Sequence, residues 1–463
     1  MIRFINRKKE LEILDNLWKL KNCFVVVYGR RRIRKTRLIE EFLKNKKGIS
    51  YISEDTSKKI QIREFKNTLA QFFNDEFLRS QEIDSWSSLL SYLEKTINLN
   101  EKFYIWIDEF SYLVKNDPFL PSSLQKFIDK VIRRSNIFFI VSGSLLGIMR
   151  EKVLSYSSPL YGRRTKDILL TALPFPDAIK FLNFNFTDSI KTYMTIGGIP
   201  EYLLVASRYN DFSEFISKEF FEKDGYFYRE PFFLLSREFK EIITYLSILD
   251  AISYGNTKPT NIANFVGIRT REIYPYLELL INFGFLEKIT PLLTKKKTGI
   301  YIIKDVLFDF WFNFVHRNRN LIERNIYKLE KDELEQFFGK RFEYFVFKHF
   351  HFFFKNFVRV GRWWGFWKDE RGEKVTEEID ILALNERTKE ILFCECKWKN
   401  KVNAKKICEK LAEKTQHVKW HNNERREYFA IFAKSFSRRI EAVSYTHLRA
   451  HETRHDLVCR LLL

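Results

Sequence analysis

The segment Gly-Arg-Arg-Arg-Ile-Arg-Lys-Thr at positions 29–36 constrains the fold of this chain more than any other. It follows the apolar run 24–28 and precedes a helical pattern at 37–42, which is the strand–loop–helix context of a phosphate-binding loop. Its first glycine, its lysine and its threonine match the template G-x-x-x-x-G-K-[ST]. The segment therefore predicts a nucleotide site, although a chance match to so short a template is an alternative.

Each part of the loop has an expected role in binding ATP and Mg²⁺. Backbone N–H groups of the loop, with the N-terminus of the following helix, would cradle the phosphate oxygens. Lys35 would reach the β- and γ-phosphates, and the hydroxyl of Thr36 would bind Mg²⁺. The candidate nucleotide-binding residues of the loop are Gly29, Arg30, Arg31, Arg32, Ile33, Arg34, Lys35 and Thr36.

Arg34 departs from the template, which has a second glycine before the lysine. Glycine lets such a loop curl closely around phosphates, because it has no Cβ and adopts left-handed backbone conformations without strain. An arginine keeps a positive charge there, but it adds bulk and restricts the backbone. A damaging change, a sequencing error and a tolerated variant are the alternatives at this position.

A second motif lies about 70 residues after the loop. The apolar run 102–107 ends in Asp108 and Glu109, the Walker B arrangement. Asp108 would hold the magnesium shell and Glu109 would polarise the attacking water; an ordinary acid pair at a strand end is the alternative. A third apolar run, 137–141, ends in a Ser-Gly-Ser segment whose Ser142 is a candidate sensor of the γ-phosphate, with a simple turn as the alternative.

The order of expected elements indicates the fold class. Strands alternate with helices over residues 8–141, which predicts an α/β fold with a parallel sheet and right-handed crossovers. Helical patterns then occupy residues 175–230, and we expect them to form a lid after the core.

The order of expected helices and strands changes near residue 240. The expected elements are helices at 242–252, 259–266 and 270–283, followed by strands at 284–289 and 299–303. This order is typical of a winged helix, with Lys295, Lys296 and Lys297 in a basic wing. In DNA-binding examples the third helix enters the major groove and the wing contacts phosphates. A packing module is the alternative, and Pro275 is unfavourable inside the third helix.

A second constellation of charged residues lies near the C-terminal end. Two successive strand patterns carry Asp380 and the pair Glu395 and Lys397, and a helical pattern upstream carries Glu343. Residues two apart on a strand share a face, so the carboxylate at 395 and the ammonium at 397 point the same way. Asp380 and Glu395 are candidate Mg²⁺ ligands, and Lys397 is a candidate to position the attacking water.

This D…E-x-K order resembles the restriction-endonuclease-like, or PD-(D/E)XK, nuclease fold, in which Glu343 matches the helical acid. The resemblance implies Mg²⁺-dependent cleavage of nucleic acid. A degenerate nuclease fold, in which the pair Glu395 and Lys397 is only structural, is the alternative.

As a set, the motifs resemble the archaeal-type P-loop ATPases, an AAA-like family with a nuclease-like C-terminal domain. The matching segments are 4–7, 28–32, 107–110, 158–165 and 197–203. The family has a glycine where this chain has Arg34. The resemblance implies that Arg163 or Arg164 acts as an arginine finger on the γ-phosphate, in its own subunit or in a neighbouring copy; a surface arginine pair is the alternative.

These patterns together predict the domain organisation. The expected parts are a P-loop ATPase core at 1–172, a helical lid at 173–235, a winged helix at 236–305, a helical linker at 306–335, a small α/β nuclease-like domain at 336–443 and a tail at 444–463.

Composition restricts the partners. The chain has 80 Lys and Arg against 59 Asp and Glu, a formal net charge of +21, which favours an anionic partner such as DNA; a lysine-rich solvated surface is the alternative. Five cysteines without metal-type spacing, no apolar run long enough for a membrane span and no signal-peptide core indicate a cytoplasmic protein without a membrane partner. The sequence is compatible with a homo-oligomer.

Residues 444–463 differ from the rest of the chain. They contain no lysine or phenylalanine and hold three of the eight histidines. The segment resembles translated sequencing-adapter read-through, and we set it aside in predicting the fold. His447, His451 and His455 have the spacing of a metal-binding helix face, an interpretation that we reject.

Two functional hypotheses result. The first is an ATP-dependent, DNA-associated enzyme with a Mg²⁺-dependent nuclease domain, and the intact Asp380, Glu395 and Lys397 favour it. The second is a nucleotide-gated switch with weak or no hydrolysis and a degenerate nuclease-like domain, which Arg34 favours. A DNA-binding regulator with two inactive sites is a third reading.

Overall fold

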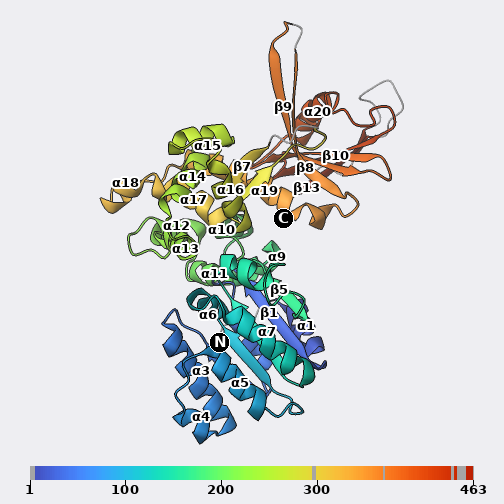
Figure 1. The fold of residues 1–463 in the computed structure, drawn as a ribbon. Coiled ribbons are helices and arrows are strands. Elements are labelled where there is room, and N and C mark those ends of the chain that lie inside the picture. Colours follow the sequence, from blue (N-terminus) through green and yellow to red (C-terminus); the bar gives the residue numbers. More distant parts are fainter. Residues whose placement is uncertain (1–5, 295–298, 369–370, 439–442, 446–454, 462–463) are drawn as a thin grey trace. The chain divides into compact units, whose positions relative to one another are not determined.

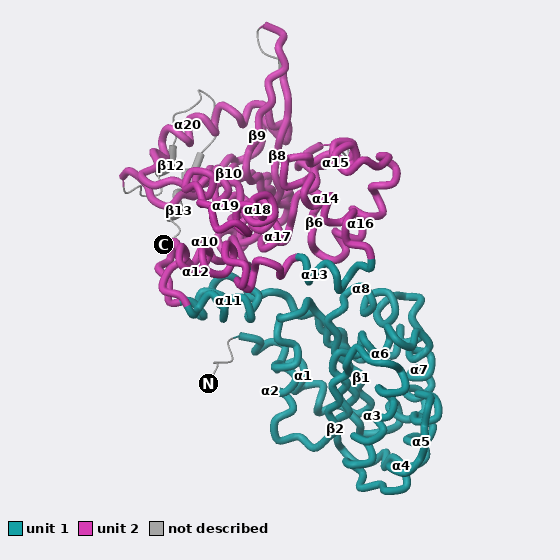
Figure 2. The backbone as a smooth tube through the Cα atoms, turned by 90° about the vertical axis from the view of Figure 1, so that its left-hand side faces the viewer, with its two compact units in different colours: residues 1–182, 197–208, 232–240 teal, residues 183–196, 209–231, 241–463 magenta. Residues whose placement is uncertain are grey.

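The computed structural model describes residues 6–294, 299–368, 371–438, 443–445 and 455–461. The chain divides into two compact units (Figure 2). Unit 1 comprises residues 1–182, 197–208 and 232–240, and unit 2 comprises residues 183–196, 209–231 and 241–463. The helices that we expected to form one lid at 173–235 are thus divided between the two units.

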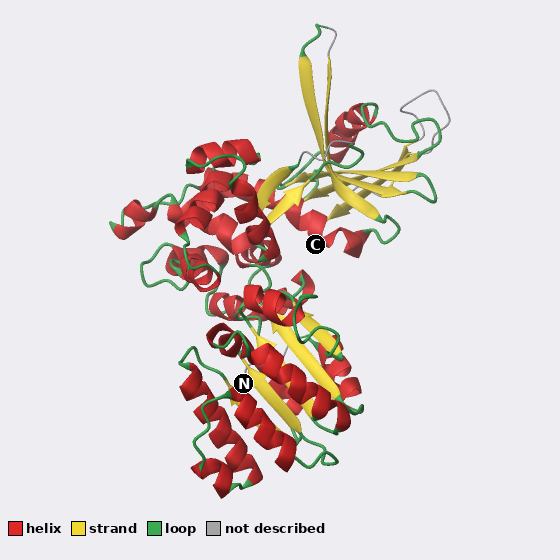
Figure 3. Ribbon diagram, viewed as in Figure 1, coloured by secondary structure: helices red, strands yellow, loops and turns green. Residues whose placement is uncertain are grey.

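Unit 1 is built around a five-stranded sheet of order β2-β3-β4-β1-β5, in which neighbouring strands are parallel. Helices cover both faces of this sheet (Figures 1 and 3). The strands are β1 (Cys23–Gly29), β2 (Gly48–Ile52), β3 (Tyr104–Asp108), β4 (Phe138–Gly143) and β5 (Lys166–Leu170). The predicted α/β fold with a parallel sheet is confirmed.

The helices of unit 1 follow the expected alternation with the strands. They are α1 (Lys8–Trp18), α2 (Lys35–Leu43), α3 (Lys58–Phe73), α4 (Glu76–Ser80), α5 (Trp86–Thr96), α6 (Phe110–Asn116), α7 (Leu120–Lys130), α8 (Leu146–Ile148), α9 (Phe175–Ala178) and α11 (Pro200–Ala206). The helix α13 (Glu230–Glu238) lies mostly in unit 1.

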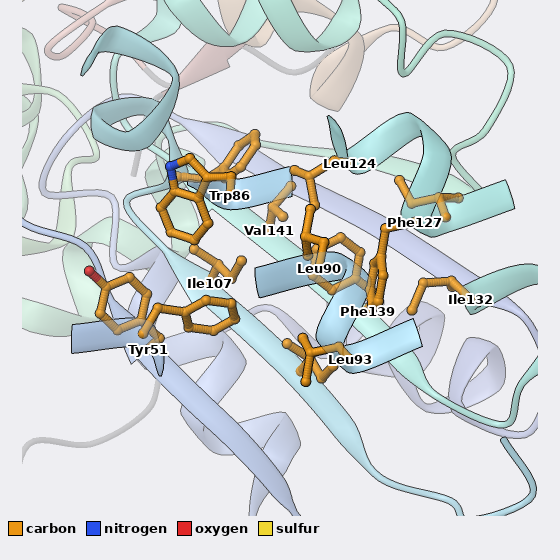
Figure 4. Packing of buried hydrophobic residues seen from close by; sticks show 14 of the residues in the cluster. Tyr51, Trp86, Leu90, Leu93, Ile107, Leu124, Phe127, Ile132, Phe139 and Val141 are labelled. Carbon is orange, nitrogen blue, oxygen red and sulfur yellow. The ribbon is translucent and has the colours of Figure 1, made fainter. Parts of the chain in front are cut away.

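Strand β1 shows why the sheet is the middle layer of unit 1. Phe24 and Val26 point into one buried apolar cluster, and Val25 and Val27 point into a second cluster on the opposite face. In the larger cluster, side chains of α5 and α7 pack on β3 and β4 (Figure 4). A strand that is buried on both faces is typical of a parallel sheet covered by helices.

Unit 2 combines helices, a two-stranded hairpin and a mixed sheet (Figures 1 and 3). Its helices are α10 (Phe186–Ile196), α12 (Phe212–Phe220), α14 (Ile243–Ser253), α15 (Pro259–Val266), α16 (Ile273–Asn282), α17 (Val306–Phe310), α18 (Arg319–Glu323), α19 (Lys331–Phe353) and α20 (Ala404–Thr415). Its strands are β6 (Leu286–Ile289), β7 (Ile300–Ile303), β8 (Arg359–Lys368), β9 (Lys374–Asn385), β10 (Glu390–Lys397), β11 (Arg426–Ala433), β12 (Val443–Tyr445) and β13 (His455–Leu461).

The elements α14, α15, α16, β6 and β7 occur in the order that we predicted for a winged helix. Pro275 lies in the first turn of α16, where its missing N–H removes no intrahelical bond. The wing lysines 295–297 lie outside the described residues. The assignment as a DNA-binding winged helix stays a prediction.

The hairpin β6–β7 packs against the C-terminal part of unit 2. Glu287 on β6 accepts hydrogen bonds from the Tyr344 hydroxyl at 2.7 Å and from Lys348 Nζ at 3.0 Å, both on α19. After β6, the backbone N–H of Leu292 donates to the carbonyl of Arg362 on β8 at 2.8 Å. The hairpin is therefore fixed to the helix and to the strand that border the C-terminal acids.

The six-stranded sheet of unit 2 has the order β12-β13-β11-β10-β9-β8. Its strands β8, β9 and β10 are antiparallel, whereas β11 is parallel to β10 and to β13. The sheet thus includes residues 443–445 and 455–461, although we had set residues 444–463 aside; the origin of that tail stays a prediction. His447 and His451 lie outside the described residues. None of the helices in the described parts of the chain is both long and apolar enough to span a lipid bilayer.

Candidate nucleotide site and second carboxylate site

The phosphate-binding loop connects β1 to α2 at the carboxyl edge of the parallel sheet of unit 1. Gly29 is required at its start, because a Cβ there would lie 2.5 Å from the carbonyl oxygen of Leu170 on β5. Ile33, with only 3% of its surface exposed, anchors the middle of the loop in the core. The loop is thus held at both of these points before any ligand binds.

Arg34 has the backbone conformation that the template glycine would supply. Its φ of 67° and ψ of 45° lie in the left-handed region, which costs a residue with a Cβ roughly 1–2 kcal/mol. The guanidinium group reaches α11, where its Nη2 lies 3.5 Å from Oε2 of Glu201. Arg34 therefore preserves the path of the loop and ties it to a segment whose Gly197-Gly198-Ile199-Pro200 sequence enters α11.

A second arginine of the loop also contacts α11. Arg32 has a φ of 68°, and its guanidinium carbon lies 5.8 Å from the centre of the Tyr202 ring.

Lys35 is buried inside the loop. Its Nζ donates hydrogen bonds to the carbonyl oxygens of Gly29 at 3.1 Å and of Arg30 at 3.4 Å. Burial lowers the pKa of the ammonium group, and the charges of Glu109 and Asp108 oppose that shift. The cation is therefore held where the predicted phosphates would neutralise it.

Thr36 and Asp108 come together although β1 and β3 are not neighbours. The Thr36 hydroxyl donates a hydrogen bond of 2.6 Å to Oδ2 of Asp108, and β4 lies between their strands. Oδ1 of Asp108 accepts from the hydroxyl of Ser142 on β4 at 2.6 Å and from the backbone N–H of Glu109 at 2.9 Å. A hydroxyl and a carboxylate at this spacing are oxygen ligands of the kind that Mg²⁺ prefers, so the residues present fit the predicted ion.

Ser142 is hydrogen-bonded to both Asp108 and Trp106. Its side chain is fully buried, and its hydroxyl accepts a hydrogen bond from Nε1 of Trp106 at 2.8 Å while donating to Asp108. In this arrangement the hydroxyl orients Asp108, and the contact of Ser142 with the γ-phosphate stays a prediction.

Glu109 immediately precedes α6 and has a left-handed φ of 50°. Its Oε2 accepts hydrogen bonds from the hydroxyl of Ser144 at 2.6 Å and from the backbone N–H of the same residue at 3.2 Å. The carboxylate thus lies beside Asp108 and is held by the end of β4.

Arg163 and Arg164 lie at the other end of the sheet from the loop. Lys166 pairs with Val25 near the start of β1, whereas Leu170 pairs with Gly29, and the four steps along the strand from position 166 to position 170 span about 13 Å. Each arginine is also held in an ion pair, Arg163 with Asp129 at 2.8 Å and Arg164 with Asp167 at 2.9 Å. This placement does not support a finger within the same subunit, and the arginine-finger assignment of Arg163 or Arg164 stays a prediction.

Three residues near the loop were missed by sequence reasoning. The Tyr112 hydroxyl on α6 accepts hydrogen bonds from Nη1 of Arg31 at 3.4 Å and from Nη1 of Arg237 on α13 at 3.2 Å. Glu238 accepts from the backbone N–H of Leu146 at 3.4 Å, and burial raises the pKa of its carboxyl to about 7. No local motif marks these residues, because α13 reaches the site from more than a hundred positions downstream.

The second site centres on Asp380, which is 5% exposed. Between the pairs Gly361–Leu382 and Trp363–Ile379, β9 has one residue more than β8, which is a β-bulge of the kind that redirects a side chain. Oδ2 of Asp380 accepts a hydrogen bond of 2.8 Å from the backbone N–H of Cys396 on β10.

Glu395 and Lys397 lie on β10 and form an ion pair. Lys397 Nζ donates to Oε1 of Glu395 at 2.7 Å. The other oxygen of that carboxylate, Oε2, is buried without a hydrogen bond among the described residues and lies 3.7 Å from Nζ of Lys414 on α20. The neighbouring Cys394 and Cys396 are buried.

Burial and the negative charges of neighbouring acids raise the pKa values of two carboxyl groups in this second site. Burial and the charge of Asp380 raise the pKa of Glu343 on α19 to about 7, and burial and the charge of Glu395 raise the pKa of Asp380 to about 6. Arg362 Nη2 donates to Oε2 of Glu343 at 2.8 Å. Although burial alone would lower it, the hydrogen bond to Glu395 and the charges of Glu395, Asp380 and Glu343 raise the pKa of Lys397, so the structure brings the four predicted residues together.

The acids of the second site could hold a magnesium ion with two carboxylates and several waters, but not with a larger set of protein ligands from the described residues. In the described part of the chain, no group of three or more His, Cys, Asp or Glu side chains is arranged to hold a metal ion. Mg²⁺, however, commonly binds through one or two carboxylates and keeps several waters. Asp380 and Glu395, with the unbonded Oε2 of the latter, satisfy that smaller requirement.

A cleft of about 860 Å³ opens beside Asp380 within unit 2. Its lining includes Glu343, Arg362 and Asp380 as well as Tyr254 and Arg317. The hairpin β6–β7 and helix α19 also contribute to its lining.

Comparison with known proteins places the chain in a family. The sequence model of an ATPase domain predominantly from Archaea matches residues 4–205, and a model of archaeal and bacterial proteins of unknown function matches residues 311–407. An uncharacterized protein of Methanocaldococcus jannaschii is 33% identical over 446 residues, which cover 93% of this chain and 95% of that protein. This chain belongs to the archaeal-type ATPase family.

Other proteins are similar to this archaeal-type ATPase over shorter stretches or in fold. An uncharacterized ATP-binding protein of Methanocaldococcus jannaschii is 50% identical over 48 residues, covering 10% of this chain and 81% of that protein. The Walker-type ATPase of Pyrococcus abyssi has a TM-score of 0.47 at 20% identity and covers 67% of this chain and 96% of its own. The ORC1 protein of Aeropyrum pernix, solved in complex with DNA, has a TM-score of 0.38 at 11% identity and covers 70% and 95%.

Replacement of Arg34 tests its effect on nucleotide binding. Arg34→Gly should raise the affinity for ATP with Mg²⁺ about tenfold, equivalent to about 1.4 kcal/mol, because it removes both the Cβ and the tie to Glu201. Arg34→Ala and Glu201→Gln, which remove the tie but leave a Cβ at position 34, should gain less. Titration calorimetry measures all four proteins, and an unchanged affinity for Arg34→Gly would show that the loop tolerates the arginine fully.

The buried Glu238 predicts a pH dependence of stability. Its carboxyl has a pKa of about 7 in the folded chain against an ordinary value of 4.5, so the folded state binds the proton more tightly. Stability should therefore fall as pH rises from about 4.5 to 7, and Glu238→Gln should remove about 2 kcal/mol of that fall. Urea denaturation at pH 5 and pH 8 measures it, with the exposed Glu94→Gln as control; an equal fall in both variants contradicts the assignment.

Proposed function

We propose that this archaeal-type ATPase binds ATP with Mg²⁺ between the loop at 29–36 and the acids at 108–109, and hydrolyses the γ-phosphate bond. The observation that supports it most is the hydrogen bond of 2.6 Å between the Thr36 hydroxyl and Asp108. It joins the loop to the end of β3 across an intervening strand, where a phosphate-bound metal would need ligands from both.

Each residue has a separate task in this proposal. Lys35, whose pKa is lowered by burial, would bind the β- and γ-phosphate oxygens, whose negative charge would neutralise its ammonium group. Thr36 and Asp108 would hold Mg²⁺, which supplies charge neutralisation of the phosphates. Glu109 would orient the attacking water and accept its proton. Ser142 would keep Asp108 in place through their hydrogen bond.

A nucleotide-gated switch with little hydrolysis is the second candidate. Two observations favour it. Arg34 stands in the place of the template glycine, and Oε2 of Glu109 already accepts a hydrogen bond of 2.6 Å from the Ser144 hydroxyl. Hydrolysis would require Glu109 to leave that serine. Turnover measurements separate the two candidates, since both require nucleotide binding.

For the C-terminal part of unit 2 we propose a Mg²⁺-dependent nuclease that acts on DNA. The convergence of Asp380, Glu395 and Lys397 near Glu343 supports it, together with the unbonded Oε2 of Glu395. Asp380 and Glu395 would hold the metal, and Lys397 would position the attacking water. The net charge of +21 and the helix–hairpin order at 243–303 are compatible with a nucleic-acid partner.

Glu109→Gln tests the ATPase proposal. The variant should lose ATP turnover by about 100-fold or more, because an amide cannot accept the proton of the attacking water, and it should still bind ATP. Phosphate release and calorimetry measure the two properties on the same protein. Glu94→Gln, which changes an exposed acid on α5 that pairs with Lys130, is the control, and unchanged turnover in Glu109→Gln would refute the assigned base.

Asp380→Ala tests the nuclease proposal. We expect it to abolish Mg²⁺-dependent cleavage of labelled DNA, because the remaining Glu395 carboxylate cannot hold the metal alone. Glu386→Gln, an exposed acid in the turn after β9, should cut like the unmodified chain. Cleavage that persists in Asp380→Ala would place the activity elsewhere or in a contaminant.

A further inference from the structure

We infer that the cleft beside Asp380 takes a single strand of nucleic acid whose bases stack on aromatic side chains within the cleft and on the sheet face that continues it. The inference rests on the proposed nuclease function and names the substrate class of that site.

One aromatic surface lies on β8, which carries Trp364 and Phe366 on one face. Trp364 pairs with Glu378 and Phe366 pairs with Thr376 on β9, and residues directly opposite each other in an antiparallel pair share a face. Glu378 lines the cleft beside Asp380. The two aromatic side chains therefore continue the face of the sheet that carries the cleft.

Phe366 is free of the core packing that would explain it as a structural residue. Its side chain is 65% exposed, on a hairpin that extends beyond the rest of the sheet (Figure 1). The Nζ of Lys374 lies 4.2 Å from the centre of its ring. An exposed ring with a cation beside it suits a base and its phosphate, since aromatic platforms combined with positive charge bind single strands. Trp363, one residue before Trp364, is by contrast buried in the core.

The cleft itself carries a second aromatic platform. Tyr254 is 55% exposed, and the guanidinium carbon of Arg317 lies 3.8 Å from the centre of its ring. Arg317 is held there by a hydrogen bond of 3.1 Å from Nη2 to the hydroxyl of Ser253. Both Tyr254 and Arg317 line the same cleft as Asp380, so a strand bound there would have this ring and this guanidinium group available for stacking.

The charge and size of the cleft favour a single strand over a duplex. Of the described residues that line it, four are basic and five are acidic, and the basic Arg341 and Arg362 are paired with Asp309 at 3.2 Å and Glu343 at 2.8 Å. Duplex binding depends on unpaired cations along the phosphate backbone, whereas single strands gain much of their affinity from stacking. A volume of about 860 Å³ is typical of a small-molecule site and accommodates a few nucleotides of one strand.

The test measures binding without cleavage, on the full chain in EDTA. Fluorescence anisotropy of a fluorescein-labelled oligothymidylate should show tighter binding than the matching dA·dT duplex. Phe366→Ala and Tyr254→Ala should each weaken oligothymidylate binding about tenfold, and Phe366→Trp should restore it. Phe119→Ala, which removes a phenylalanine that is 78% exposed in unit 1, is the matched control and should bind normally.

Equal affinity for the duplex, absence of oligothymidylate binding, or normal binding by both Phe366→Ala and Tyr254→Ala would overturn the inference. The nuclease proposal fails separately. If oligothymidylate binds as expected but no cleavage depends on Asp380, the nuclease proposal is wrong and the strand-binding inference stands. If cleavage depends on Asp380 but requires duplex DNA, the inference is wrong and the nuclease proposal stands.

Discussion

The hydrogen bond between the Thr36 hydroxyl and the Asp108 carboxylate is the contact on which the nucleotide site depends. Asp108 is 2% exposed, and a buried carboxylate is costly unless its oxygens are paired. Its oxygens are satisfied by Thr36 from the loop, by Ser142 from β4 and by the backbone of Glu109. Three consecutive strands of the sheet are thus connected at one point before any ligand binds, which fixes the loop relative to the acids.

The sequence predicted those parts of this site that depend on local patterns. Apolar runs followed by a glycine-rich template or an acid pair identify β1, the loop and β3, because a parallel sheet brings the carboxyl ends of its strands to one edge. It could not place Arg163 and Arg164, whose position depends on the register of β5 against β1. It also could not reveal that the hydroxyl of Ser142 accepts a hydrogen bond from the indole of Trp106, because Trp106 lies on the neighbouring strand β3.

In unit 2 as well, local sequence patterns predicted some features of the site, whereas others depend on contacts between residues far apart in the sequence. Alternation along β10 predicted that Glu395 and Lys397 share a face, and their ion pair at 2.7 Å confirms it. The bulge at Asp380 and the packing of the hairpin β6–β7 on α19 depend on pairings across many residues, which no local pattern reveals. The cleft that results is lined both by the helix–hairpin elements and by the acids.

A crystal structure of the full chain with a non-hydrolysable ATP analogue and Mg²⁺ tests the central claim most directly. We expect the triphosphate to lie on the backbone of the loop, with Lys35 Nζ turned from the Gly29 carbonyl to the phosphates and the metal ligated by Thr36 near Asp108. A nucleotide bound elsewhere, or a metal without contact to Thr36, would contradict the account.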